Sequence, residues 1–170
     1  MSALRTAVLL AATVTMGLAA GLFQAFSYAV MPGLGDTRDE VFVEAMQRIN
    51  VAIVNPWFAT IVVGALVLTG LAAASELRRR SGPGLAWTAA ALLLYVATLV
   101  ITRGVSIPLN DTLDAAGDPG ALPDVAAVRE RFEDRWNRWN AIRALTSTAA
   151  FGCLAWALAR HRRWSPAAKT

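Results

Sequence analysis

The chain alternates long apolar stretches with short segments rich in charge. From Thr6 to Gly35, about 30 residues pass without an Asp, Glu, Lys, Arg or His, and further apolar stretches run over about 50–75, 81–102 and 144–159. A helix needs roughly 20 apolar residues to cross the hydrocarbon core of a bilayer. The pattern therefore predicts an all-α protein, a four-helix transmembrane bundle whose spans lie at about 5–30, 55–75, 85–102 and 141–160 and form one domain, residues 1–170.

The first apolar stretch also has features of a secretory signal. Arg5 precedes an apolar core and the small residues Gly17, Ala19 and Ala20, as in a cleavable signal peptide. The apolar character continues beyond these small residues for more than a turn, to Val30. We therefore favour an uncleaved first helix.

A short amphipathic helix is predicted between the first two spans. Pro32 and Gly33 should end the first span, because proline lacks a backbone donor and glycine favours helix ends. Thr37 and Glu40 have the spacing of a capping box. The apolar residues that follow fall on one face, namely Val41, Phe42, Ala45, Met46 and Ile49. We expect this helix to lie on the membrane surface or over the mouth of the bundle.

Turn signals predict the ends of the second and third spans. Asn55 followed by Pro56 is typical of a helix N-cap and first helical residue, so span two should begin there. Span three should close at Arg103, before Pro108. The connection over 106–123 is predicted to be a loop.

The last helix is predicted to be longer than a membrane requires. Helical spacing of apolar residues returns at Asp124 and continues to about Ala159, which corresponds to roughly 50 Å, against a hydrocarbon core of about 30 Å. Its first part should therefore protrude. Within that part, Arg129 with Glu133 and Asp134 with Arg138 are i, i+4 pairs, interpreted as a solvated face.

The formal net charge of +4 is best explained by membrane topology, and no nucleic-acid partner is expected. Basic residues cluster beside predicted helix ends, at Arg5, 78–80 and 160–163. Because positive residues favour the cytoplasmic side, we expect a multi-pass protein of the cell membrane with both termini in the cytoplasm. Trp57, Trp136 and Trp139 would then lie near the other interface, as an aromatic belt.

Cysteine and histidine are too scarce for several kinds of site. The only cysteine, Cys153, lies inside the last span, and the only histidine, His161, lies in the terminal basic cluster. A disulfide, a Cys-x-x-Cys pair, a bis-histidine haem and a thiolate or histidine metal site within one chain are thereby excluded. No cofactor and no metal is expected. Patches of small residues, Gly64, Gly70 and 72–74, would permit close helix contact within or between protomers, so oligomerisation stays open.

Unusual polar residues gather at one predicted mouth of the bundle, away from the termini. They are Gln24, Ser27, Asn50, Asn55, Arg103, Asn110, Asn137, Asn140 and Arg143. Each has an ordinary alternative. Arg103 and Arg143 can snorkel to the interface, Asn50 and Asn55 can cap helices, and Trp136 and Trp139 can serve in packing. A site made of Arg, Asn and Trp would suit a planar, phenolic or anionic small molecule, because guanidinium stabilises phenolate or enolate charge and indole stacks on rings.

Several segments resemble one family. The residues that carry the resemblance are Gly21, Phe23, Phe26, Ser27, Val30, Met31, Pro32, Gly33, Leu34, Phe42, Ala45, Met46, Gln47, Ile49, Asn50, Asn55, Pro56, Phe58, Pro108, Leu109, Asn110, Trp136, Trp139, Asn140 and Arg143. Together they are similar to the anthrone-oxygenase-like integral membrane family, most of whose members have no assigned reaction.

The resemblance implies a chemistry that needs no metal or flavin. Fungal members of this family are associated with oxidising anthrones to anthraquinones with molecular oxygen. By implication, Arg103 and Arg143 would stabilise an enolate, with Asn50, Asn110 and Asn140 as hydrogen-bond partners. Asp111 is the one carboxylate at the mouth that could act as base, and its alternative is a loop residue.

A reading from a different class stays open beside the enzyme. The protein could be a non-catalytic membrane protein that binds a lipid or a protein partner at the outer mouth, with the helix 124–140 as the docking surface. Bound lipid or protein without turnover would favour this reading.

Overall fold

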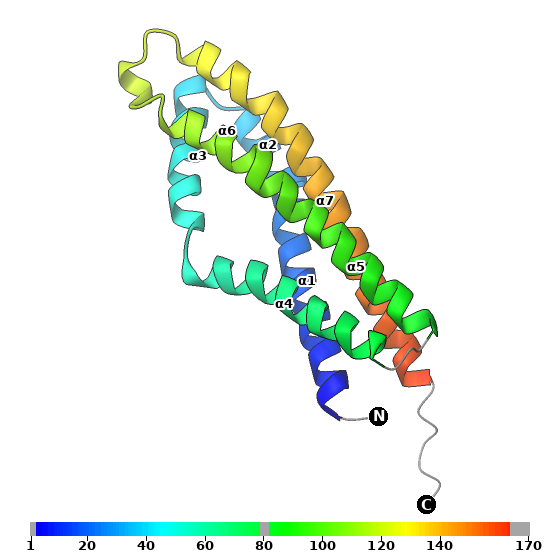
Figure 1. Ribbon diagram of the computed structural model, residues 1–170. Helices are drawn as coiled ribbons and strands as arrows, with labels where there is room; N and C mark the ends of the chain where they lie inside the picture. The colour runs from blue at the N-terminus through cyan, green and yellow to red at the C-terminus, as the bar shows by residue number, and fades with distance from the viewer. Residues whose placement is uncertain (1–2, 79–81, 164–170) are drawn as a thin grey trace, which may run out of the picture.

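A computed structural model describes residues 3–78 and 82–163 of the chain. That part is helical throughout, without a β-strand (Figure 1). Its elements in chain order are α1 (Ala3–Ala25), η1 (Phe26–Val30), α2 (Met31–Gly35), α3 (Asp39–Ile53), α4 (Pro56–Leu77), α5 (Gly82–Ile101), η2 (Thr102–Ser106), α6 (Ile107–Asp114), η3 (Pro119–Ala121) and α7 (Val125–Arg163).

Four helical segments are long and apolar enough to cross a bilayer, as predicted. They are Ala3–Gly35, Pro56–Leu77, Gly84–Asp114 and Val125–Arg160. The chain is therefore a multi-pass membrane protein of the four-helix class. The start of α1, the end of α4, the start of α5 and the end of α7 lie at one end, and α2, α3 and α6 gather at the other (Figure 1). We call these the terminal end and the mouth.

The predicted ends of the first and third spans were wrong for a shared reason. Each helix continues past its proline. A five-residue π-helical turn precedes the proline in both cases, η1 before Pro32 and η2 before Pro108. In each turn a backbone N–H donates five residues back, from Met31 to Phe26 and from Ile107 to Thr102. A π turn is wider than an α turn, and the missing proline N–H falls in the first turn of the next α-helix, where it is tolerated. Eight residues of the predicted loop 106–123 are consequently helical, as α6.

Small side chains let the spanning helices pack closely. Helix α7 packs on α1 and α5, while α4 packs on α1 and α5. The buried cluster between them is built largely from alanine: Ala12, Ala19, Ala65, Ala72, Ala91, Ala150 and Ala157, with Met16, Tyr95 and Leu154. Alanine at helix contacts allows close approach and hence dispersion contact within the membrane.

An ion pair joins α1 to α4 at the terminal end. Arg5 donates to the carboxylate of Glu76, and both side chains are largely buried. Gly84 lies against that carboxylate, since a Cβ at residue 84 would be 2.9 Å from the Glu76 Oε2 atom. Two other basic residues predicted for this end, Arg79 and Arg80, lie outside the described residues.

Helix α3 is the predicted amphipathic helix, but its start differs from the prediction. Its buried residues are Phe42, Val43, Met46 and Asn50, close to the expected face. The Thr37 hydroxyl donates to the Leu34 carbonyl instead of closing a capping box, and the helix begins at Asp39. Asn55 caps α4 as predicted, because its side-chain oxygen accepts from the Phe58 N–H at 3.0 Å.

The first part of α7 is held to α2 and α3 by Arg129. Helix α7 has 39 residues, about 58 Å at 1.5 Å per residue, so it is the long fourth helix expected. Arg129 pairs with Glu133, as predicted, but also with Asp39 and with the carbonyls of Gly35 and Thr37. Its interpretation as a solvated residue was therefore wrong. Among the described side chains no ion pair joins Asp134 to Arg138.

Candidate functional site

Arg143 is buried inside the bundle. Only 6% of the residue is exposed, so the snorkelling alternative does not hold for it. Its Nη2 donates to the Asn140 Oδ1 atom at 2.9 Å, and its guanidinium lies over the rings of Phe23 at 4.8 Å and Trp136 at 5.4 Å. Among the described residues, the buried Arg143 Nε atom has no hydrogen-bond partner, and no carboxylate pairs with the side chain.

Asn140 connects Arg143 to the π turn of the first helix. Its Nδ2 donates to the Phe23 carbonyl at 3.1 Å and to the Ser27 hydroxyl at 2.9 Å. The wide turn of η1 interrupts the α-helical hydrogen-bond pattern, and the Phe23 carbonyl also accepts from the Ser27 hydroxyl. The two hydrogen bonds from Nδ2 hold the amide nitrogen of Asn140 against α1 and η1, and the amide oxygen faces the guanidinium of Arg143.

Trp136 connects the same site to α6. Its indole N–H donates to the Asn110 Oδ1 atom at 2.9 Å, and its ring packs on Phe26 with centroids 5.5 Å apart. Only 5% of Trp136 is exposed, so its interpretation as a belt residue was wrong. Trp57 is 81% exposed, as a belt residue would be.

A row of stacked groups runs from Arg143 to Arg129. Trp136 stacks on Phe132 at 6.2 Å, Phe132 meets Phe42 edge-on at 6.3 Å, and the Arg129 guanidinium lies 4.5 Å from the centre of the Phe42 ring. We call this row the aromatic ladder. Aromatic pairs at these separations are favourable, and each ladder end is a cation over a ring.

The remaining predicted site residues lie apart from Arg143. Arg103 and Asp111 are exposed, Asn55 is exposed and acts as a helix cap, and Trp139 is half-buried. Asn50 is buried on α3, and its Nδ2 atom has no partner among the described residues. Of the predicted site residues, the structure therefore brings together Arg143, Asn140, Trp136 and Asn110. One hydrogen bond joins Arg143 to Asn140, and another joins Trp136 to Asn110.

Sequence reasoning missed the phenylalanines of the site. Phe42 was assigned to an apolar face, and Phe23 and Phe132 were given no role in the site, yet Phe42 and Phe23 supply rings to the two arginines. A signal for Phe132 was present, because residues 129, 132, 136, 140 and 143 recur at helical spacing on one face of α7. No comparable signal pairs Phe42 with Arg129, since they lie on different helices.

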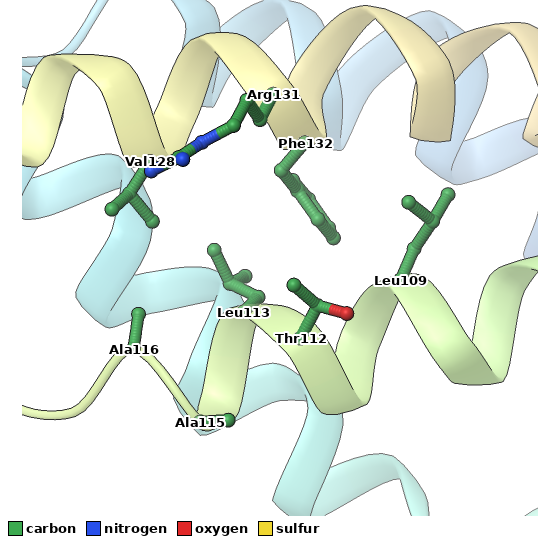
Figure 2. A pocket seen from close by; sticks show the side chains of 8 residues that line it. All are labelled: Leu109, Thr112, Leu113, Ala115, Ala116, Val128, Arg131 and Phe132. Atoms are coloured by element: carbon green, nitrogen blue, oxygen red, sulfur yellow. The ribbon is translucent and has the colours of Figure 1, made fainter.

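A pocket with a volume of about 310 Å³ opens between α6 and α7. We call it the α6–α7 pocket. Figure 2 shows Leu109, Thr112 and Leu113 facing Val128 and Phe132 across it, with the Arg131 side chain at its edge. Phe132 is thus both a pocket wall and a rung of the aromatic ladder. Arg143 does not line the pocket.

No set of three His, Cys, Asp or Glu side chains in residues 3–78 and 82–163 is arranged to hold a metal ion.

Comparison with known proteins gave one result. A family model described as "Anthrone oxygenase" matches residues 49–153, which is more than half of the chain. Neither the curated proteins nor the solved structures gave a match.

Proposed function

Because the chain belongs to the anthrone oxygenase family, we propose that it is a cofactor-independent oxygenase of an anthrone-like or phenolic small molecule, acting at the mouth of the bundle. The matched residues include Asn110, Trp136, Asn140 and Arg143. In this proposal molecular oxygen is the second substrate and the membrane lipid is the surrounding solvent.

The observation that carries the proposal is the unpaired guanidinium of Arg143. A buried charge is costly unless a counter-charge or hydrogen bonds compensate for it. Arg143 has one amide oxygen and two rings, and its Nε atom still has no partner. An anion that forms during a reaction would supply the missing partner, and a preorganised donor of this kind stabilises such an anion more than it stabilises a neutral substrate.

The chemistry requires that the substrate be its own reductant. The anthrone first loses a proton from the carbon that will become the new carbonyl, and the resulting enolate is stabilised by Arg143. The enolate passes one electron to oxygen, and the radical and superoxide combine with a proton to form a hydroperoxide. Loss of water from the hydroperoxide leaves a new carbonyl. Overall, one anthrone and one O₂ give one quinone and one H₂O.

Asp111 does not belong to this cluster, so in this proposal solvent water at the mouth accepts the proton that the substrate loses. Asp111 is exposed, and it follows Asn110, whose side chain is turned to Trp136. Stabilisation of the enolate makes the carbon acid easier to ionise, which reduces the demand for a strong base. Asn110 and Asn140 then act as positioning residues for Trp136 and Arg143.

We expect the purified protein to consume oxygen when it meets an anthrone. The measurement combines an oxygen electrode with quinone absorbance, and one O₂ should disappear for each quinone formed. Detergent buffer alone and heat-denatured protein give the spontaneous rate. If native protein does not exceed that rate, the oxygenase proposal is wrong, and mass spectrometry for co-purified lipid or protein would then test the non-catalytic alternative.

The proposal includes an orientation in the cell membrane with both termini in the cytoplasm. Arg5 and Arg78 lie at the terminal end, and basic residues favour the cytoplasmic side. In a Cys153→Ser background, an impermeant maleimide applied to intact cells should label Asp118→Cys at the mouth. Arg78→Cys should be labelled only after lysis. The reverse pattern would contradict the orientation.

A further inference from the structure

The α6–α7 pocket has the shape and lining of a binding site for an apolar group. Its walls are Leu109, Leu113, Val128 and Phe132, with alanine at one side (Figure 2). Ligand sites in proteins are usually concave, mostly apolar and begin at about 300 Å³. The volume of about 310 Å³ is therefore sufficient for a small molecule and too small for a whole phospholipid.

Positive charge lies along one edge of this pocket. Arg131 is the only charged residue among the eight that line it. Arg135 and Arg138 follow at i+4 and i+7, so the three arginines form one stripe on α7, which also includes the exposed Asp134 at i+3. All three side chains are exposed. We call them the arginine stripe.

None of the acids near the pocket is among the residues that line it. Asp111 and Asp114 are neighbours of the lining residues Thr112 and Leu113 in α6, and both acids are exposed. Glu133, beside Phe132, is already paired with Arg129. Among the residues that line the pocket, an anion would thus meet one charged group, the Arg131 guanidinium.

We infer that the α6–α7 pocket binds the apolar tail of a small amphipathic anion, such as a medium-chain carboxylate, with its charged head on the arginine stripe. The tail gains contact with leucine, valine and phenylalanine side chains, and each methylene that leaves water strengthens binding. The head gains a guanidinium partner at an exposed edge. This site is separate from Arg143, and the inference does not depend on oxygenase activity.

A ligand in the α6–α7 pocket should change the packing around Arg143 in the candidate site. Phe132 forms a wall of the pocket and stacks on Trp136, whose ring lies under Arg143. A tail that displaces the Phe132 ring must change the packing of Trp136. Such a ligand would therefore act on the site through the aromatic ladder without touching it.

Three probes with one tail separate the contribution of charge from that of apolar contact. Octanoate, 1-octanol and octylammonium are titrated calorimetrically into full-length protein in nanodiscs of zwitterionic lipid, with empty nanodiscs as the partition control. Octanoate should bind saturably at one site per chain and more tightly than octanol, and octylammonium should not bind saturably. Equal binding of all three, or none above the empty discs, would overturn the inference.

Variants locate the site. Thr112→Phe and Ala116→Leu fill the pocket from two exposed or half-buried positions and should abolish saturable octanoate binding. Arg131→Gln should weaken octanoate roughly fivefold, the upper end for an exposed ion pair, and leave octanol unchanged. Arg48→Gln, an exposed arginine on α3, is the control. If octanoate binds both filled variants as it binds the native chain, while their thermal unfolding is unchanged, the pocket is not the site.

Discussion

Replacing Arg143 with glutamine should lower the rate of quinone formation by about 100- to 1000-fold, the range for loss of one preorganised anion stabiliser. Glutamine keeps a donor for Asn140 but removes the charge. The fold should survive, because the change removes a buried charge that lacks a carboxylate partner, and such a charge is itself costly. The measurement is initial rate beside the thermal unfolding midpoint of each variant.

Two further variants make this result specific. Arg143→Lys keeps the charge but loses the planar fork that reaches Asn140 and lies over Phe23 and Trp136, so it should recover only part of the rate. Arg48→Gln removes an exposed arginine and should keep the native rate. An Arg143→Gln protein that stays within twofold of the native rate would remove Arg143 from the mechanism.

Replacing Arg129 with alanine should destabilise the protein by about 3 kcal/mol, toward the lower end for breaking a buried ion pair. The Arg129 side chain is 14% exposed, and the change leaves Asp39, Glu133 and the Gly35 carbonyl without their donor. It also removes the cation over Phe42. Because Asp39 is partly exposed, solvent recovers some of the loss. The measurement is the free energy of unfolding in detergent.

The matched control is another arginine in an i, i+4 pair. Arg48 pairs with Glu44 on α3, but its side chain is 78% exposed, so Arg48→Ala should change stability by no more than about 0.5 kcal/mol. Limited proteolysis provides a local readout, since loss of Arg129 should expose the connection between α2 and α3 to cleavage. Equal losses in the two variants would show that Arg129 does not hold this connection.

The membrane spans could be predicted because hydropathy is a local property of the chain. The length of α7 and the cap at Asn55 were likewise predictable from spacing and from the Asn-Pro pair. Helix α6 was not, because Pro108 signals a helix end and nothing in the sequence shows that a π turn absorbs it. Capping at Thr37 failed because its hydroxyl found a nearer acceptor in Leu34.

The candidate site was predictable only in part, because burial depends on which way each helix faces. Arg103 and Arg143 look alike in the sequence, because each lies beside an apolar stretch. In the structure Arg103 is exposed, whereas Arg143 is buried, with only 6% of the residue exposed. Arg129 was paired correctly with Glu133, but its contacts to α2 and α3 are tertiary. Such contacts join residues about 90 positions apart, beyond the reach of any local pattern.

The two π turns have a consequence for comparing this chain with others. Each turn holds one residue more than an α-helix of the same length, so every position beyond it is rotated by about 100° from an uninterrupted helix. A relative that lacks the extra residue at 26–30 or 102–106 would present a different side of α2 or α6 to α7. Alignments of such chains should therefore carry a one-residue gap within an otherwise ungapped membrane span. Its presence would mark a change in the direction of Asn110 or Leu34 that residue identity alone conceals.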